Sequence, residues 1–126
     1  MAEGNKNFFD TPDTTSEYEA QDIQDNKVMG ILAYIGILVL VPIFAAKNSR
    51  YARFHANQGL VLLICGAAVI ITLSILGIIP YVGIVFRIIS YLAELAFAGL
   101  VVFGIVHVAK GRAKELPLIG KFRILK

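Results

Sequence analysis

Thirty-one consecutive residues, from Ala56 to Phe86, carry no charge, and this run limits most strongly what the chain can fold into. Its first four residues are the end of the basic and aromatic block SRYARFHANQG at residues 49–59. Such a junction is typical of a membrane–water boundary, where Lys and Arg stay in water and the apolar residues must pair their backbone groups within a helix. The junction therefore predicts an integral membrane protein.

Two other stretches are similarly apolar. Residues 28–46 are 19 residues without a charge, about the length of helix that crosses a bilayer core of roughly 30 Å. Residues 88–109 are interrupted only by Glu94 and His107. Apolar residues make up 57% of the 126-residue chain, and the mean hydropathy is +0.72.

The 31-residue run is too long for one span, and the turn-forming sequence GIIPYVG at residues 77–83 divides it into two helices. Ser49 is a favourable N-cap, which places the start of the second helix at about Arg50. We therefore predict an all-α membrane protein with three transmembrane helices, at about residues 28–46, 50–76 and 84–109, within one membrane domain at residues 28–109.

Charge is distributed unevenly along the chain. Residues 1–27 hold two bases and seven acids, a net charge of −5, whereas the remainder holds ten bases and two acids, a net charge of +8. We expect residues 1–27 to form an acidic, mostly disordered tail and residues 110–126 to form a basic amphipathic tail at the membrane surface. Because the basic residues lie beside apolar spans, they predict contact with the anionic inner leaflet and no binding of nucleic acid.

The basic residues also predict an orientation. With three spans, nine Lys and Arg residues lie on one side of the membrane and three on the other. The positive-inside rule then places the N-terminus outside and the C-terminus in the cytoplasm of a multipass protein of the bacterial plasma membrane. The residues expected to contact lipid or the surface are Lys47, Arg50, Arg53, Lys121, Arg123 and Lys126.

The start of the second helix presents three faces. Small residues line one face and predict close helix packing, while basic residues lie roughly opposite. Between them Tyr51, His55 and Gln58 form a narrow polar strip. Two interpretations stay open: the strip is a contact or relay site on the cytoplasmic side, or it is an interfacial anchor whose polar groups satisfy the end of the first helix.

The third span contains a polar group that is costly inside a bilayer. Glu94 lies near the middle of this span, where an acidic or basic residue costs about 2.5–3.5 kcal/mol on insertion scales. It shares a helix face with Arg87, Ser90 and Tyr91. The four residues predict either an ion- or proton-coupled site or a polar contact between helices.

Catalysis and metal binding have no candidate residues in this sequence. His55 and His107 are expected at a similar depth, but no third ligand of suitable spacing accompanies them. No nucleophile motif, phosphate-binding loop or pair of carboxylates is present. We predict no catalytic residues, no metal and no cofactor, and therefore a protein that is not an enzyme.

One family resemblance rests on the segment DIQDNKVMGILAYIGILVLVPIFAAKNSRYARFHANQGLVLLI and on the terminal ELPLIGKFRILK. These residues resemble a group of small bacterial membrane proteins of unknown function. That group is related to the twenty-kilodalton membrane component of the chloroplast inner-envelope protein import (Tic) machinery. The chain departs from both patterns, because its N-terminal part lacks the cysteines of a zinc ribbon and it has room for three spans rather than four.

These observations predict a non-enzymatic accessory or structural subunit of a membrane complex, with a protein partner or further copies of itself. The resemblance adds a connection with protein transport as a hypothesis. The alternative is a homo-oligomeric ion channel or small transporter that uses Glu94 and Arg87.

Overall fold

A computed structural model describes residues 12–117 and 119–124 of the chain. The regular secondary structure of the described part is helical, apart from an isolated bridge between Asp13 and Lys114. Its elements in chain order are η2 (Thr15–Glu17), α1 (Ala20–Asp25), α2 (Lys27–Leu32), η3 (Gly36–Val39), α3 (Leu40–Ala45), α4 (Arg50–Leu76) and α5 (Gly83–Ala109).

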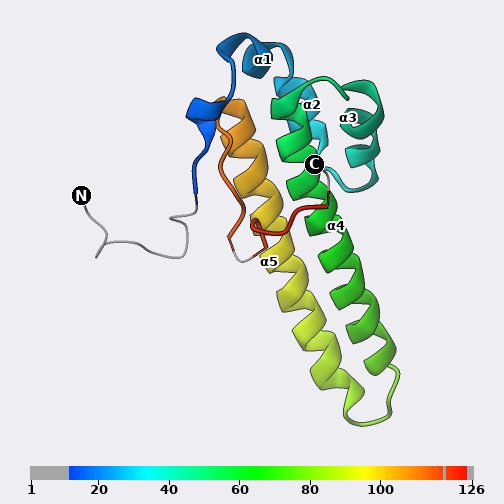
Figure 1. The fold of residues 1–126 in the computed structure, drawn as a ribbon. Coiled ribbons are helices and arrows are strands. Elements are labelled where there is room, and N and C mark those ends of the chain that lie inside the picture. The colour runs from blue at the N-terminus through cyan, green and yellow to red at the C-terminus, as the bar shows by residue number, and fades with distance from the viewer. Residues whose placement is uncertain (1–11, 118, 125–126) are drawn as a thin grey trace, which may run out of the picture.

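Helices α4 and α5 run antiparallel and form a long hairpin (Figure 1). The Ser49 hydroxyl accepts a hydrogen bond from the Ala52 N–H at 3.0 Å, so the predicted N-cap of α4 is confirmed. The turn between the helices contains Tyr81, which adopts a positive φ of 67° and is 97% exposed. We call this turn, residues 77–82, the tip, and the opposite end of the hairpin the cap end.

Both long helices are long and apolar enough to cross a membrane. Their outward faces are apolar and uncovered, as Ile75 at 61% and Leu95 at 70% exposure illustrate. Exposed apolar surface of this extent is typical of a protein that meets lipid or another protein. The predicted class, an all-α membrane protein, is confirmed.

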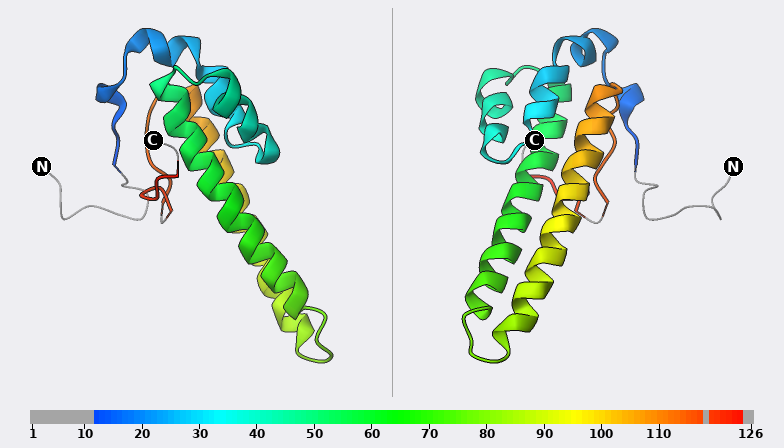
Figure 2. Two further views of the ribbon diagram at one scale, coloured as in Figure 1. Left: turned by 45° about the vertical axis from the view of Figure 1, so that its right-hand side comes forward. Right: turned by 180° about the vertical axis from the view of Figure 1, so that it is seen from behind.

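The first apolar stretch does not form the first of the three predicted transmembrane helices. Residues 28–46 fold into the short helices α2 and α3, with η3 between them, and the chain reverses so that α3 returns toward the cap end (Figure 2). Gly36 adopts a φ of 51° at the reversal, a conformation that favours glycine. Each six-residue helix is only about 9 Å long, far short of a bilayer core of roughly 30 Å.

Close packing fixes this short hairpin against the long one. A Cβ added at Gly59 of α4 would lie 1.7 Å from the carbonyl oxygen of Ala33, so the α2 backbone rests directly on α4. Ala52 and Ala56, on the same face of α4, are fully buried, which confirms the predicted small-residue packing face. Farther along, Gly66 packs against the Phe97 ring of α5.

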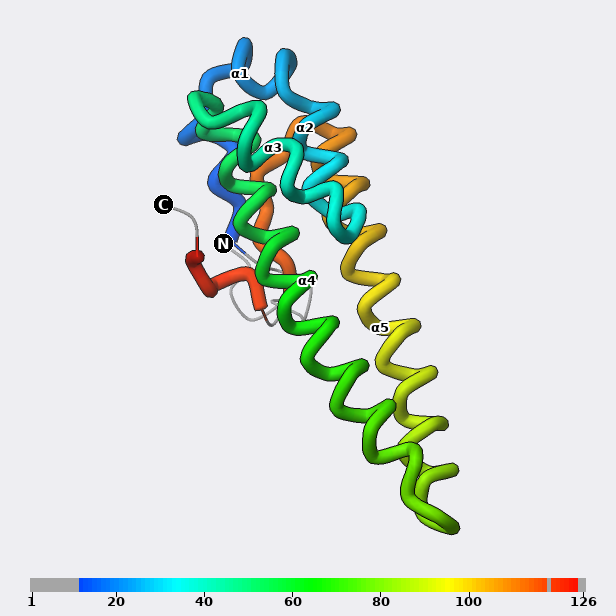
Figure 3. Tube along the Cα trace, turned by 90° about the vertical axis from the view of Figure 1, so that its right-hand side faces the viewer, coloured from blue at the N-terminus to red at the C-terminus, as the bar shows by residue number. Residues whose placement is uncertain are grey.

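The N-terminal segment is folded from residue 12 onward, against the predicted disorder of residues 1–27. Residues 1–11 lie outside the described residues. The Thr14 N–H donates to the carbonyl of Ala113 at 2.9 Å, and α1 lies over the start of α4 (Figure 3). The two terminal segments therefore contact each other at the cap end.

Candidate functional site

The predicted polar strip of α4 is fully buried beneath the segment that follows α5. Tyr51, His55 and Gln58 each have 0% exposure. The covering chain, residues 110–124, leaves the end of α5 and runs back beside both long helices (Figures 1 and 2). We call it the C-terminal segment; its residue 118 is outside the described residues.

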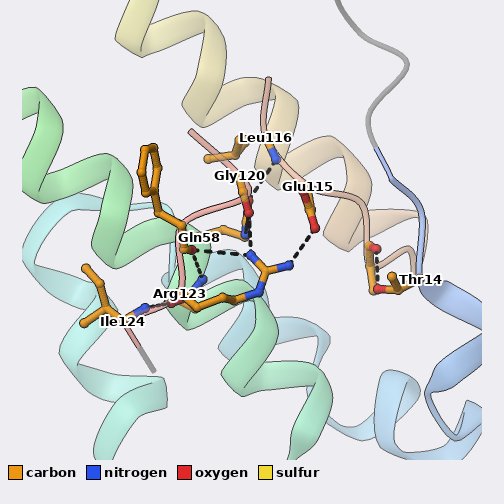
Figure 4. Close-up of polar contacts among 10 residues, drawn as sticks. Thr14, Gln58, Glu115, Leu116, Gly120, Arg123 and Ile124 are labelled. Carbon is orange, nitrogen blue, oxygen red and sulfur yellow. Dashed lines mark hydrogen bonds and ion pairs between the residues drawn. The ribbon is translucent and has the colours of Figure 1, made fainter. Parts of the chain in front are cut away.

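Two neighbouring amides of α4 hold the backbone of this segment. Gln58 donates from Nε2 to the carbonyl of Gly120 at 2.9 Å and accepts from the Leu116 N–H at 2.8 Å (Figure 4). Asn57 donates from Nδ2 to the carbonyl of Phe122 at 2.8 Å and accepts from the Ile124 N–H at 2.6 Å. We call Asn57 and Gln58 the amide clamp. Asn57 is 2% exposed.

His55 joins three parts of the fold. Its Nε2 lies 2.8 Å from the carbonyl oxygen of Arg112, which makes Nε2 the donor. Its Nδ1 then accepts a hydrogen bond from the Tyr34 hydroxyl at 2.7 Å. The Tyr51 hydroxyl also donates to the carbonyl of Arg112, at 3.2 Å. Among the described residues, every buried side-chain nitrogen or oxygen has a partner.

The hydrogen bonds of the strip lie within the protein. Its polar groups pair mainly with backbone carbonyls and N–H groups of the chain itself, which favours a role in holding the fold together. Most of the hydrogen-bond partners of the strip lie in the C-terminal segment, and fewer lie in the first apolar stretch. In this conformation the strip is a structural joint between α4, α2 and the C-terminal segment.

A second polar junction, which no local sequence pattern predicted, lies at the start of α4. The Asp22 carboxylate of α1 accepts from the Ser49 hydroxyl at 2.5 Å and from the Tyr51 N–H at 3.0 Å. An acid beside a helix N-terminus is favourable because the first backbone N–H groups point toward it. Cavities of about 450 Å³ and 330 Å³ flank this junction, and Asn48 lines both.

The residues predicted to contact lipid or the surface differ in how much of each side chain is exposed. Lys47 and Arg50 are exposed at the cap end, and Arg53 is half-buried there. Arg123 has its guanidinium 2.6 Å from the Glu115 carboxylate and 5.9 Å from the centre of the Phe54 ring, so much of it is engaged within the fold. Lys121 is exposed, and Lys126 lies outside the described residues.

The four polar residues of α5 do not act as one cluster. Ser90 is 7% exposed and faces the interior, whereas Arg87, Tyr91 and Glu94 are exposed on the outside of the hairpin. No ion pair joins Arg87 to Glu94 among the described residues. The hairpin by itself therefore encloses no site made from Arg87 and Glu94.

The fold and its internal polar joints define a small helical membrane protein with a two-helix hairpin and a compact cap. Magnetosome protein MamF from Paramagnetospirillum magneticum is 33% identical over 98 residues, which cover 75% of this chain and 79% of that protein. Magnetosome protein MmsF from the same organism is 33% identical over 95 residues, with 73% and 79% covered. Magnetosome protein MamF from Magnetospirillum gryphiswaldense is 33% identical over 92 residues, with 73% and 77% covered.

The chain belongs to the family of the magnetosome proteins MamF and MmsF. The resemblance to relatives of the chloroplast import component was therefore wrong, and the hypothesis of protein transport that depended on it loses its support. No family model matches the sequence, and no solved structure matches it.

Proposed function

We propose that this chain is a non-enzymatic structural protein of a bacterial membrane that works by associating with further copies of itself. The hairpin of α4 and α5 crosses the bilayer, and the cap, residues 12–58 together with residues 104–124, lies on one side of it. In keeping with the names of its relatives, the membrane is that of the magnetosome.

The position of Glu94 is the observation that carries this proposal. Glu94 is exposed about halfway along α5, with apolar neighbours such as Leu92 and Leu95. An acidic side chain at this depth costs about 2.5–3.5 kcal/mol in lipid, so a neighbouring protein surface that supplies a hydrogen-bond donor is strongly favoured over lipid. The polar strip cannot serve this purpose, because it is already paired within the chain.

A second copy offers a suitable hydroxyl donor at a similar depth. Tyr91 is 65% exposed on α5, three residues or about 4.5 Å along the helix axis from Glu94. A head-to-tail contact in which Tyr91 of one copy meets Glu94 of the next would supply this donor. Such a contact repeats around a ring, so the association extends beyond a dimer.

The distribution of charge supports placing the whole cap in the cytoplasm. Nine Lys and Arg residues of the described part lie at the cap end, and Arg87 alone lies near the tip. A two-span hairpin then satisfies the positive-inside rule without translocating the acidic N-terminal segment. This replaces the orientation predicted for three spans.

Cysteine labelling tests this orientation. Cys65 is first replaced by Ala, and single cysteines are then introduced as Asp13→Cys, Lys110→Cys and Tyr81→Cys. A membrane-impermeant maleimide applied to the cytoplasmic face is expected to label positions 13 and 110 and to spare position 81. Labelling of positions 13 and 110 from opposite faces would contradict the two-span arrangement.

Mass measurement in mild detergent tests the association. The wild-type chain is expected to run as a multiple of its 13.8 kDa, and Glu94→Leu is expected to shift it toward the monomer. Ile71→Ala, at another exposed position of the hairpin, is the matched control and is expected to leave the mass unchanged. A wild-type monomer would refute the association.

The channel alternative depends on the same exposed carboxylate. In a ring that turns Glu94 toward a common axis, Glu94 would line a pore. Ion flux through liposomes that carry the wild-type chain, lost in Glu94→Gln, would establish this alternative over the structural role. A labelled copy that fails to accumulate with magnetosomes in a Magnetospirillum cell would contradict the proposed location.

A further inference from the structure

Arg87 is an isolated cation close to the tip of the hairpin. It begins the second turn of α5, and the tip itself, residues 77–82, has no charged residue. Arg87 is exposed and forms no ion pair with the described residues. The nearest acid along α5 is Glu94, seven residues or about 10 Å farther into the membrane.

The fold holds the stem of Arg87 against the end of α4. A Cβ added at Gly77 would lie 3.0 Å from Cγ of Arg87, so the glycine leaves the space that this side chain occupies. The guanidinium therefore belongs to an open depression of about 520 Å³ at the tip. The depression is lined by Ser74, Gly77, Ile78, Ile79, Pro80, Tyr81 and Arg87.

The composition of this depression suits the phosphate of a phospholipid. Its walls are about equally polar and apolar, and the polar side chains are the Ser74 and Tyr81 hydroxyls and the Arg87 guanidinium, which are all able to donate hydrogen bonds. A guanidinium binds phosphate oxygens with two parallel hydrogen bonds. No side chain caps the first turn of α5, so its N-terminal dipole also favours an anion here.

The membrane determines the source of the phosphate. An arginine one turn from the end of a spanning helix reaches toward the headgroup layer, where lipid phosphates are concentrated. The exposed tyrosine at the tip is also typical of the interface.

We propose that the depression formed by Ser74, Gly77, Tyr81 and Arg87 binds the headgroup phosphate of an anionic phospholipid in the leaflet at the tip. The site rests on the hairpin crossing the membrane and is independent of self-association. It assigns Arg87 to lipid binding rather than to ion conduction.

The absence of tryptophan from the chain allows a test confined to the tip. Val82→Trp, next to the depression and outside its lining, introduces a single tryptophan, and energy transfer is measured to phosphatidylglycerol or phosphatidylcholine with a dansyl group on the lipid. The cap lies about 40 Å away, at the other end of the 27-residue helix α5, so lipids bound there contribute little. We expect transfer to the phosphatidylglycerol probe to exceed transfer to phosphatidylcholine, with an apparent preference of roughly fivefold.

Variants and competitors make the result specific. Arg87→Gln is expected to abolish the preference and Arg87→Lys to retain part of it, whereas Lys110→Gln, at the other end of the same helix, leaves it unchanged. Equal transfer to both lipids, or a preference that survives Arg87→Gln, would overturn the site. Loss of the preference on adding inorganic phosphate, but not chloride at equal ionic strength, would show a free-phosphate site instead. Absence of transfer to either lipid would contradict the proposed topology, in which the hairpin crosses the membrane.

Discussion

The Asp22 carboxylate and the Ser49 hydroxyl form a 2.5 Å hydrogen bond that fastens α1 to the start of α4. The Ser49 hydroxyl in turn accepts from the Ala52 N–H, while the second Asp22 oxygen accepts from the Tyr51 N–H. Two side chains 27 residues apart thus satisfy two of the N–H groups that a helix leaves free at its N-terminus. The N-terminal segment and the long hairpin are joined by these hydrogen bonds.

Replacing Asp22 should weaken the cap. Asp22→Ala removes the charged acceptor for Tyr51 and Ser49, and we expect a loss of about 1–2 kcal/mol in the free energy of unfolding in detergent. Hydrogen exchange of the Tyr51 amide should rise in parallel. Asp25→Ala is the control, since Asp25 has an exposed contact with Gln21 and should cost less than about 0.5 kcal/mol. Equal effects of the two variants would contradict the role given to Asp22.

The amide clamp should hold the C-terminal segment in place. Gln58→Leu leaves the buried Leu116 N–H without its partner, at a cost of about 1–3 kcal/mol, and leaves the Gly120 carbonyl with Arg123 alone as a donor. We expect tryptic cleavage after Lys114 and Lys121 to accelerate by about tenfold or more, because the segment detaches more often. Ile64→Ala, at a half-exposed position of α4, should leave the cleavage rate unchanged. An unchanged rate in Gln58→Leu would show that other contacts hold the segment.

Two glycines should respond oppositely to the same substitution. Gly59→Ala forces its methyl group against the Ala33 carbonyl, so α2 must move, and we expect a loss of about 1–3 kcal/mol or more in the unfolding free energy. Gly99→Ala meets no atom within 4 Å and should raise stability by about 0.5–1 kcal/mol, since Ala is favoured over Gly within a helix. Thermal unfolding followed by circular dichroism measures both. A tolerated Gly59→Ala would argue against the direct contact of α2 with α4.

The contact between the terminal segments should weaken in acid. Partial burial raises the pKa of Asp13, but hydrogen bonds from Thr15 and the charges of Arg112 and Lys114 outweigh it, so the pKa lies below its ordinary value. A carboxylate with a lowered pKa stabilises the folded state above its unfolded pKa of about 3.9, and this stabilisation is lost as pH falls through the folded value. Exchange protection of the Thr14 amide should therefore fall below about pH 4. In Asp13→Asn this pH dependence should disappear, and its persistence would assign the effect to another group.

Local patterns in the sequence predicted the long helices closely. The spans predicted at 50–76 and 84–109 correspond to α4 at Arg50–Leu76 and α5 at Gly83–Ala109. Hydropathy, the breakers at residues 77–83 and the capping preference of Ser49 act over a few neighbouring residues, which is why they can be read directly. The small-residue face of α4 follows from helical spacing for the same reason.

The prediction of a transmembrane helix at residues 28–46 failed because the composition of this segment is compatible with two structures. Residues 28–46 are apolar enough for a spanning helix and also for a short hairpin buried against α4 and α5. The contacts of Tyr34 favour the hairpin, since its hydroxyl reaches His55 and its ring occupies the space beside Gly104. These contacts join residues 21 and 70 positions apart, so no local pattern reveals them.

The sequence by itself determined that this chain is an all-α membrane protein, because long uncharged runs must form helices wherever water is excluded. Only the tertiary structure decided that its polar strip is used internally and that its two terminal segments meet. Both outcomes depend on which distant backbone groups a buried side chain reaches, as Gln58 reaches Leu116 and Gly120. Burial makes such pairing obligatory, but the folded chain selects the partner.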